Sequence, residues 1–202
     1  ISGATEKMNY YMSASYLDDK GIVPNSGFQR YSARLKADYQ VKPWLKMGGN
    51  VSFTHYDSRE QDTEGGTSNA NIFYASNIMG AIYPMYVRDA QGNIMVDNRG
   101  FLRYDYGKQG QDSNGSRNTI PNANPLASYM LDKMKYSGDV VSGKWSADID
   151  IWNGIKAKVN IGVDVNNVRS TNMVNPFYGQ YSETSGVGGL ISVATERTFS
   201  VN

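Results

Sequence analysis

The chain has 202 residues, a formal net charge of +1 and a mean hydropathy of −0.52. It contains no cysteine, which excludes disulfides and thiol chemistry. Its basic residues form no runs of the kind that bind nucleic acid, so we expect no nucleic-acid partner. No apolar stretch is long enough for a transmembrane helix.

Six segments alternate apolar and polar residues with a period of two, which is the pattern of β-strands with one apolar and one hydrated face. In residues 28–39 the odd positions include Tyr31, Ala33 and Leu35, whereas the even positions carry Arg34 and Lys36. The six predicted strands span residues 7–17, 28–39, 45–56, 140–151, 155–166 and 190–201.

The connection over residues 40–44 contains Pro43, which cannot donate a backbone hydrogen bond to a strand ladder. We predict that Tyr39 lies opposite Leu45, because this register brings the two apolar faces together. The same register places Asp38 opposite Lys46. A shift by one residue would turn every charge toward the apolar side.

The connection between residues 151 and 155 contains Asn153–Gly154, a pair typical of two-residue turns. Parity favours a three-residue loop over residues 152–154, with Ile151 opposite Ile155 and Gly154 in the left-handed conformation. This loop places Asp150 opposite Lys156, and Asp148 opposite Lys158.

Short connections (40–44 and 152–154) alternate along the chain with longer ones (18–27, 57–139 and 168–189). Short turns at one end and long loops at the other are typical of outer-membrane barrels. The alternative is a soluble β-sandwich carbohydrate-binding module, in which strands are shorter and loops are similar at both ends. We predict an all-β antiparallel meander from a large transmembrane β-barrel, with strands in residues 1–56 and 140–202. Residues 57–139 form a long, mixed extracellular insertion.

Within the insertion, apolar residues at three- and four-residue spacing predict a helix over Ser68–Ile82. Residues 85–96 predict a hairpin that turns at residues 89–93. Asn124 followed by Pro125 predicts an N-cap and a short helix that runs to about Lys133.

Two sets of residues are candidates for function. The charged residues of the hydrated face should point into the barrel lumen: Arg34, Lys36, Lys46, Lys144, Asp148, Asp150, Lys156, Lys158 and Asp164. Aromatic and polar residues of the insertion could contact a sugar ligand or a partner protein, or could pack the insertion's own core. They are Tyr83, Tyr86, Arg99, Arg103, Tyr104, Asp105 and Tyr106.

His55 is the only histidine, and its parity places it on the apolar face near the long-loop end of its strand. A general base at that position would face lipid or the membrane interface, so we expect no catalytic residue and no enzyme activity. One histidine without cysteine does not make a transition-metal site, and we expect neither a metal nor a cofactor.

Several stretches in order along the chain resemble one known family. They are residues 6–23, with the letters EKMNYYMSASYLDDKGIV, followed by residues 25–35, 41–53 (VKPWLKMGGNVSF), 82–93 (IYPMYVRDAQGN) and 124–127 (NPLA). Together they resemble the barrel region of SusC/RagA-type TonB-dependent transporters of Bacteroidetes outer membranes.

The resemblance implies a barrel of about 22 strands around a plug, of which this chain would supply about six. It also implies outer-membrane lipid around the barrel, energy from a TonB complex, and a surface lipoprotein of the SusD type. The implied cargo is an oligosaccharide, or in some members a peptide. The chain starts without methionine and ends inside a predicted strand, so we expect it to be a piece of a larger protein in which the plug and TonB-contacting regions lie elsewhere.

Overall fold

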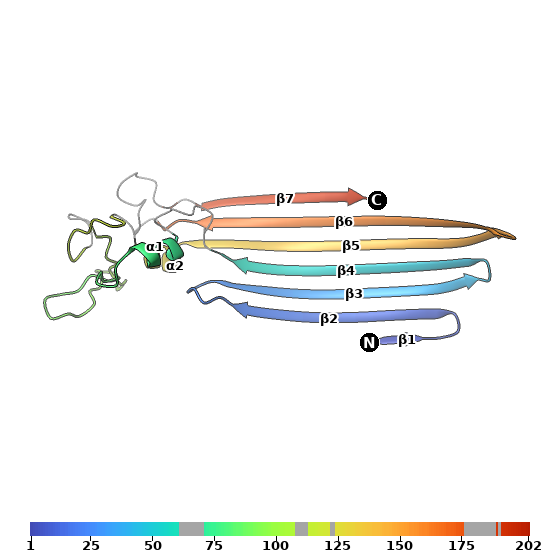
Figure 1. Ribbon diagram of the computed structural model, residues 1–202, viewed down its shortest axis with the longest axis horizontal. Coiled ribbons are helices and arrows are strands. Elements are labelled where there is room, and N and C mark those ends of the chain that lie inside the picture. Colours follow the sequence, from blue (N-terminus) through green and yellow to red (C-terminus); the bar gives the residue numbers. More distant parts are fainter. Residues whose placement is uncertain (61–70, 108–112, 122–123, 176–188, 190) are drawn as a thin grey trace.

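The computed structural model describes residues 1–60, 71–107, 113–121, 124–175, 189 and 191–202. Seven antiparallel strands form one sheet in which every strand pairs with its sequence neighbours, in the order β1 to β7. Figure 1 shows a long sheet with the two helices and their loops at one end. This all-β meander confirms the predicted fold class.

Five of the six predicted strands are longer than the alternation predicted, β7 ends at Val201 as predicted, and one short strand, β1, was missed. Their bounds are β1 Ser2–Ala4, β2 Met8–Lys20, β3 Gly27–Lys42, β4 Leu45–Arg59, β5 Lys133–Trp152, β6 Ile155–Met173 and β7 Ile191–Val201. The alternation breaks near the strand ends because polar residues occupy both faces there. Backbone pairing continues through these residues, for example from His55 opposite Asp139 to Arg59 opposite Lys135.

The register of β3 against β4 differs from the prediction by two residues. Tyr39 lies opposite Met47 instead of Leu45, and Asp38 lies opposite Gly48 instead of Lys46. Pairing continues to Lys42 opposite Leu45, with an irregularity after Gln40, because only Pro43 and Trp44 are needed for the turn. The longer ladder retains backbone hydrogen bonds that the predicted five-residue loop would lose. A shift of two residues keeps every side chain on its predicted face.

The β5–β6 hairpin confirms the predicted charge pairs and corrects the loop. Asp150 lies opposite Lys156 and Asp148 opposite Lys158, but the ladder closes with Trp152 opposite Ile155. The turn is therefore Asn153–Gly154, and the extra residue falls at an irregularity between Asp150 and Trp152. Gly154 has φ +87°, the left-handed conformation that glycine adopts without a steric cost.

The segment between β4 and β5 contains α1 (Ile72–Ile78) and α2 (Pro125–Leu131). Asn71 caps α1, since its side-chain oxygen accepts from the backbone N–H groups of Phe73 and Tyr74. The predicted 68–82 helix thus ends earlier than expected, at Ile78, and residues 68–70 of the prediction lie outside the described residues. The helix ends at Ile78 because Met79 is extended and Gly80, a poor helix former, follows.

The predicted turn at residues 89–93 is present, and Arg88 bridges to Ile94. A third extended segment joins this hairpin through bridges from Tyr86 to Tyr104 and from Val96 to Leu102. The predicted second helix is confirmed, with Asn124 as N-cap and a proline in its first turn. Among the described residues, no helix is long and apolar enough to cross a membrane.

The buried apolar residues of the described chain lie in this insertion and not in the sheet. They are Ala75, Val87, Tyr104, Tyr106, Ile120, Ala127 and Tyr129. On the sheet, large apolar side chains remain exposed, with Leu35 at 53% and Val159 at 49%. A sandwich would bury these side chains under a second sheet, and the described strands form only one.

Candidate functional site

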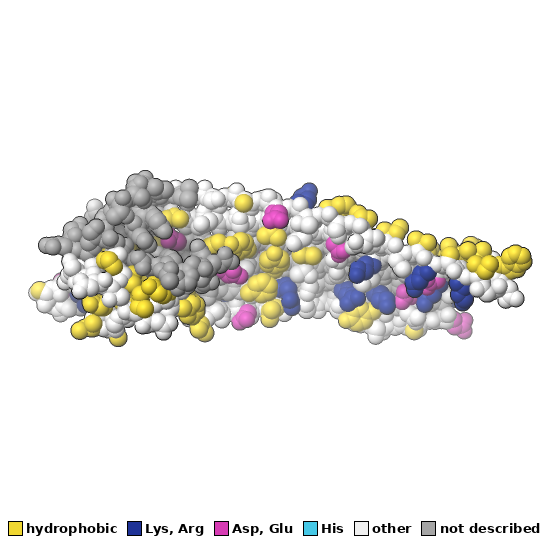
Figure 2. Space-filling model, turned by 45° about the horizontal axis from the view of Figure 1, so that its top comes forward, with side chains coloured by type: hydrophobic (Ala, Val, Ile, Leu, Met, Phe, Trp, Pro, Cys, Tyr) yellow, Lys and Arg dark blue, Asp and Glu magenta, His cyan; other side chains and the backbone are white. Residues whose placement is uncertain are grey.

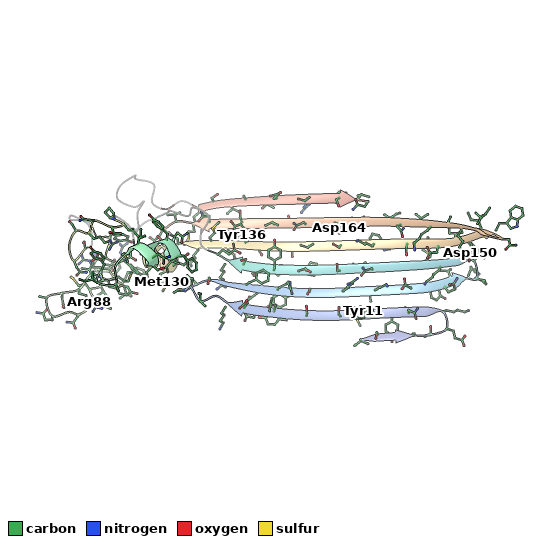
Figure 3. The ribbon with its side chains drawn as sticks, in the orientation of Figure 1. Tyr11, Arg88, Met130, Tyr136, Asp150 and Asp164 are labelled. Carbon is green, nitrogen blue, oxygen red and sulfur yellow. The ribbon has the colours of Figure 1, made fainter. Side chains whose placement is uncertain are left out.

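All nine predicted lumen-facing residues lie on one face of the sheet, which we call the wet face. It consists of the odd positions of β2 and the even positions of β3 to β6, as the pairing of Arg34 with Ser52 and of Lys144 with Gly162 requires. Figure 2 shows lysine and arginine side chains gathered on one face toward the end of the short turns. Asp150 lies near that end, and Asp164 lies further along β6 toward the insertion (Figure 3).

Ion pairs on the wet face are few and exposed. Lys158 Nζ lies 3.4 Å from Asp148 Oδ1, and Lys156 Nζ lies 3.3 Å from Asp150 Oδ1. Exposed pairs of this kind contribute only about 0.2–1 kcal/mol each. No ion pair joins Lys144 to any residue that the structure describes. The wet face thus carries charge that the sheet itself does not neutralise.

An aromatic group that the sequence reasoning missed also lies on the wet face, next to the insertion. Phe28 and Tyr56 stack with their ring centroids 6.0 Å apart. Tyr56 lies over Gly138, where a Cβ atom would overlap its ring. Tyr136 lies on the same side of the sheet, at the end of β5 that is close to the insertion (Figure 3). Phe28 and Tyr56 have even numbers, and this parity places them on the same face as the predicted charged residues. The sequence prediction considered only the charged residues of that face.

The opposite face carries the apolar residues, which we call the apolar belt. It runs from the short turns to a line across the sheet at Ala33, Phe53, Val141, Val165 and Phe199, which are ladder partners in turn. Beyond this line, toward the insertion, the same face is mixed. On β4 to β6 it carries His55, Asp139 and Asn167, whereas Tyr31 on β3 and Val193 on β7 remain exposed.

His55 lies at this polar boundary, as its parity predicted. Its Nδ1 lies 2.7 Å from Asp139 Oδ1, and its Nε2 lies 4.0 Å from Asp57 Oδ2. No serine or other nucleophile is bonded to the imidazole among the described residues, and the contact with Asp139 is a hydrogen bond on the surface of the sheet. The described residues contain no group of three histidine, aspartate or glutamate side chains that could hold a metal.

Asp105 is the centre of the insertion. Its carboxylate accepts from the backbone N–H of Gly107 and from the backbone and side-chain N–H groups of Asn114, each at 2.7 Å. Arg117 Nη1 lies 3.3 Å from Asp105 Oδ1, and both side chains are almost fully buried. Burial lowers the pKa of Arg117, and the charge of Asp105 opposes that shift.

Asn124 connects this centre to α2. Its amide donates to the carbonyl oxygens of Met85 and Asp105, at 2.8 and 2.9 Å, and its side-chain oxygen accepts from Ala127 N. Sequence reasoning placed Asn124 correctly as a cap, but Arg117 and Asn114 gave no local signal because their partners are distant in sequence.

The seven insertion candidates do not form one surface. Tyr104, Asp105 and Tyr106 are buried, and the two tyrosines pack with Ala127. Burial raises the pKa of Tyr104, with a smaller contribution from Tyr86, whose ring centroid lies 5.2 Å away.

The other four candidates are more accessible. Tyr83, Tyr86 and Arg103 are half-buried, and Arg99 is exposed, with its Nε 3.2 Å from Asp97 Oδ2. These four side chains can therefore contact another molecule, whereas the buried side chains of Tyr104, Asp105 and Tyr106 cannot.

Comparisons with known proteins agree with this architecture. No family model matches the chain. The TonB-dependent receptor P26 of Formosa agariphila is 36% identical over 59 residues, which are 29% of this chain and 6% of that receptor. The TonB-dependent receptor P39 of the same organism is 34% identical over 55 residues, which are 27% of this chain and 5% of that receptor.

Among solved structures, the chain superposes on the RagAB peptide transporter with a TM-score of 0.72 at 22% identity, over 98% of this chain and 20% of that chain. It also superposes on the RagAB peptide importer in its open-open and closed-closed states, with TM-scores of 0.68 and 0.64. The chain thus spans about a fifth of the length of these solved chains.

The described fold is a single all-β antiparallel meander that superposes on part of the RagAB peptide transporter. The sequence matches and the fold together confirm the resemblance to SusC/RagA-type TonB-dependent transporters, and this class resides in the outer membrane.

Proposed function

We propose that this chain forms part of the wall of a TonB-dependent importer, with the apolar belt against lipid and the wet face lining the lumen. The observation that carries the proposal is the single long-stranded sheet with one exposed apolar face and one charged face. A membrane barrel with a polar interior needs both faces. Further strands of the whole protein would pair with the two sheet edges, at β1 and β7 (Figure 1).

The length of the belt fits a membrane. From Leu45 to Phe53 there are eight residue steps, about 26 Å along β4. Barrel strands are tilted by 35–45° from the barrel axis, so this length spans about 20 Å of the membrane. That is close to the apolar band of about 25 Å in outer-membrane barrels. The exposed Trp44 and Trp152 lie in or beside the short turns, as residues of an interfacial aromatic girdle do.

The direction of the barrel follows from its connections. Long loops of outer-membrane barrels lie outside the cell, and short turns lie in the periplasm. We therefore place the insertion between β4 and β5 on the extracellular side, and the turns at Pro43–Trp44 and Asn153–Gly154 in the periplasm.

We propose a bulky nutrient as the cargo, an oligosaccharide in the first place and a peptide as the alternative. A SusD-like lipoprotein would cover the extracellular end, and regions outside this chain would contact the TonB complex. Aromatic rings bind the apolar faces of sugars, and the stacked pair of Phe28 and Tyr56 on the wet face supports a sugar ligand. The similarity to a peptide transporter supports the alternative.

Within the insertion, we propose Tyr83, Tyr86, Arg99 and Arg103 as contacts to cargo or lipoprotein. Tyr104, Asp105 and Tyr106 would instead hold these residues in place from the insertion core, because their side chains are buried.

The experiment that tests this function is purification of the full-length protein from detergent-solubilised outer membranes, followed by mass spectrometry of what copurifies. We expect a SusD-like lipoprotein and bound oligosaccharide. Bound peptide without oligosaccharide would overturn the first cargo and establish the second. Full-length protein found only in soluble fractions, without a lipoprotein, would overturn the importer as a whole.

A further inference from the structure

A group of basic side chains lies on the apolar-belt side of the sheet, just beyond the edge of the belt. It contains Lys135 on β5, Arg169 on β6 and Arg197 on β7, three neighbouring strands, and Arg59 on β4 lies opposite Lys135 (Figure 1). Val165 and Phe199, which lie opposite each other, are the last apolar pair before these cations, and Val193 follows beyond them on β7.

The pairing brings these cations close to one another. Asn167 lies opposite Arg197, and Arg169 lies opposite Thr195. Arg169 and Arg197 are thus diagonal neighbours on one face, about 7–8 Å apart at their backbones. Thr171 and Thr195 flank Arg169 on the same face and supply hydroxyl donors.

Two carboxylates on this face, Asp57 and Asp139, are bonded to groups other than Arg169 and Arg197. Asp139 Oδ1 lies 2.7 Å from His55, and Asp57 Oδ1 lies 3.0 Å from Lys135 Nζ and 2.6 Å from Ser137 Oγ. No ion pair joins Arg169 or Arg197 to any residue within the described ranges.

The height of these side chains above the belt matches a lipid headgroup. Arg197 is two residues past Phe199, about 7 Å along the strand, and Arg169 is four residues past Val165, about 13 Å. After correction for strand tilt these are heights of about 5 and 10 Å. The headgroup layer adds about 5–8 Å on each side of the hydrocarbon core, and arginine side chains reach toward it.

We propose that Arg169 and Arg197, assisted by Lys135, bind a phosphate group of a membrane lipid on the insertion side of the membrane. The acyl chains of that lipid would lie against the belt at Val165 and Phe199. Continuity with the belt selects a lipid over a free phosphate ion, because the same molecule then fills both surfaces. The proposal rests on the proposed orientation of the belt toward lipid.

The test uses full-length protein in detergent, with purified lipid A and enzymatically dephosphorylated lipid A as probes in native mass spectrometry. We expect the protein to bind lipid A at least about tenfold more tightly than the dephosphorylated lipid. The double variant Arg169→Gln/Arg197→Gln should lose this preference. The matched control Arg30→Gln/Arg34→Gln, on the wet face, should keep it.

Three results would overturn the proposal: equal binding of both lipids by the wild type, an unchanged preference in the Arg169→Gln/Arg197→Gln variant, or inorganic phosphate that competes as strongly as lipid A. If the glutamine variant fails to fold, Arg169→Lys/Arg197→Lys keeps both charges and should keep the preference, and its loss would also count against the site. Wild-type protein that never enters the membrane fraction would instead be a failure of the proposed function.

Discussion

Asp105 is the residue on which the order of the insertion depends, since one buried carboxylate accepts from Gly107, Asn114 and Arg117. Asp105→Asn keeps the shape but leaves Arg117 charged and buried without a counter-ion. We expect the insertion to lose about 3–5 kcal/mol of local stability. Hydrogen exchange of the insertion amides in the full-length protein measures this loss.

The control for Asp105→Asn is Asp150→Asn, at an exposed ion pair with Lys156, which should change stability by no more than about 1 kcal/mol. Insertion amides that stay equally protected in Asp105→Asn would contradict the central role of this carboxylate.

Asp89 predicts a dependence on pH in the hairpin of the insertion. The side chain and backbone N–H of Asn93, together with Gln91 N, donate to its carboxylate and hold the pKa of Asp89 below its usual range. A lowered pKa in the folded state means that this stabilisation is complete above the unfolded pKa of about 3.9 and is lost as the pH falls through the folded value.

We therefore expect the protection factors of the Gln91 and Asn93 amides, corrected for intrinsic exchange, to fall below about pH 4. Asp89→Asn removes the titrating group and should make these protection factors independent of pH over the same range. Full protection of the wild type at the lowest pH would show that the carboxylate does not hold the turn.

At the scale of the element, the two faces of one hairpin should respond in opposite ways to the same substitution. Val159 lies opposite Ala147 in the apolar belt, and Asn160 lies opposite Ser146 on the wet face. Val159→Arg should cost about 2–4 kcal/mol at the middle of the membrane and reduce insertion of the full-length barrel. Asn160→Arg adds the same side chain one residue away and should insert normally.

The measurement for this pair is the fraction of heat-modifiable, folded protein in outer membranes. Equal insertion of Val159→Arg and Asn160→Arg would count against a lipid-facing belt, and loss of both would point to a general defect in β5–β6 pairing.

The strands also show how far sequence patterns reach. The alternation predicted which face of the sheet each side chain occupies. Together with the loop between the strands, it also placed Asp148 opposite Lys158. It failed on the β3–β4 register by two residues, because faces repeat every two residues and both registers satisfy them. The choice between them depends on how far backbone pairing continues toward Pro43, which no hydrophobic pattern reports.

At the scale of the whole molecule, the insertion and the short turns lie at opposite ends of the sheet (Figure 1). The absence of native cysteine from this chain allows single cysteines to report on which side of the membrane each end lies. With a membrane-impermeant maleimide on intact cells, we expect Asn98→Cys in the insertion to react. Asn153→Cys in the β5–β6 turn should react only after the cells are permeabilised.

Both positions are exposed in the structure, so a difference in labelling reflects the membrane and not burial. The unsubstituted full-length protein gives the background. Labelling of Asn153→Cys but not of Asn98→Cys in intact cells would show that the barrel has the opposite orientation in the membrane.

The sequence by itself determined the class of fold, the two faces of the sheet, the Asn124 cap and the left-handed Gly154, because each of these depends on residues close together in the chain. Period-two alternation, Asn124 before Pro125, and Gly154 after Asn153 are local signals with local causes. The lengths of the two short turns were decided by how far the backbone ladders continue. Only the tertiary structure decided which of the insertion candidates are buried and which are accessible. The partners of Asp105 come from Asn114, Arg117 and Asn124, and the cations beyond the belt come from three strands. Such contacts depend on packing between distant segments, and packing leaves no periodic trace in the sequence.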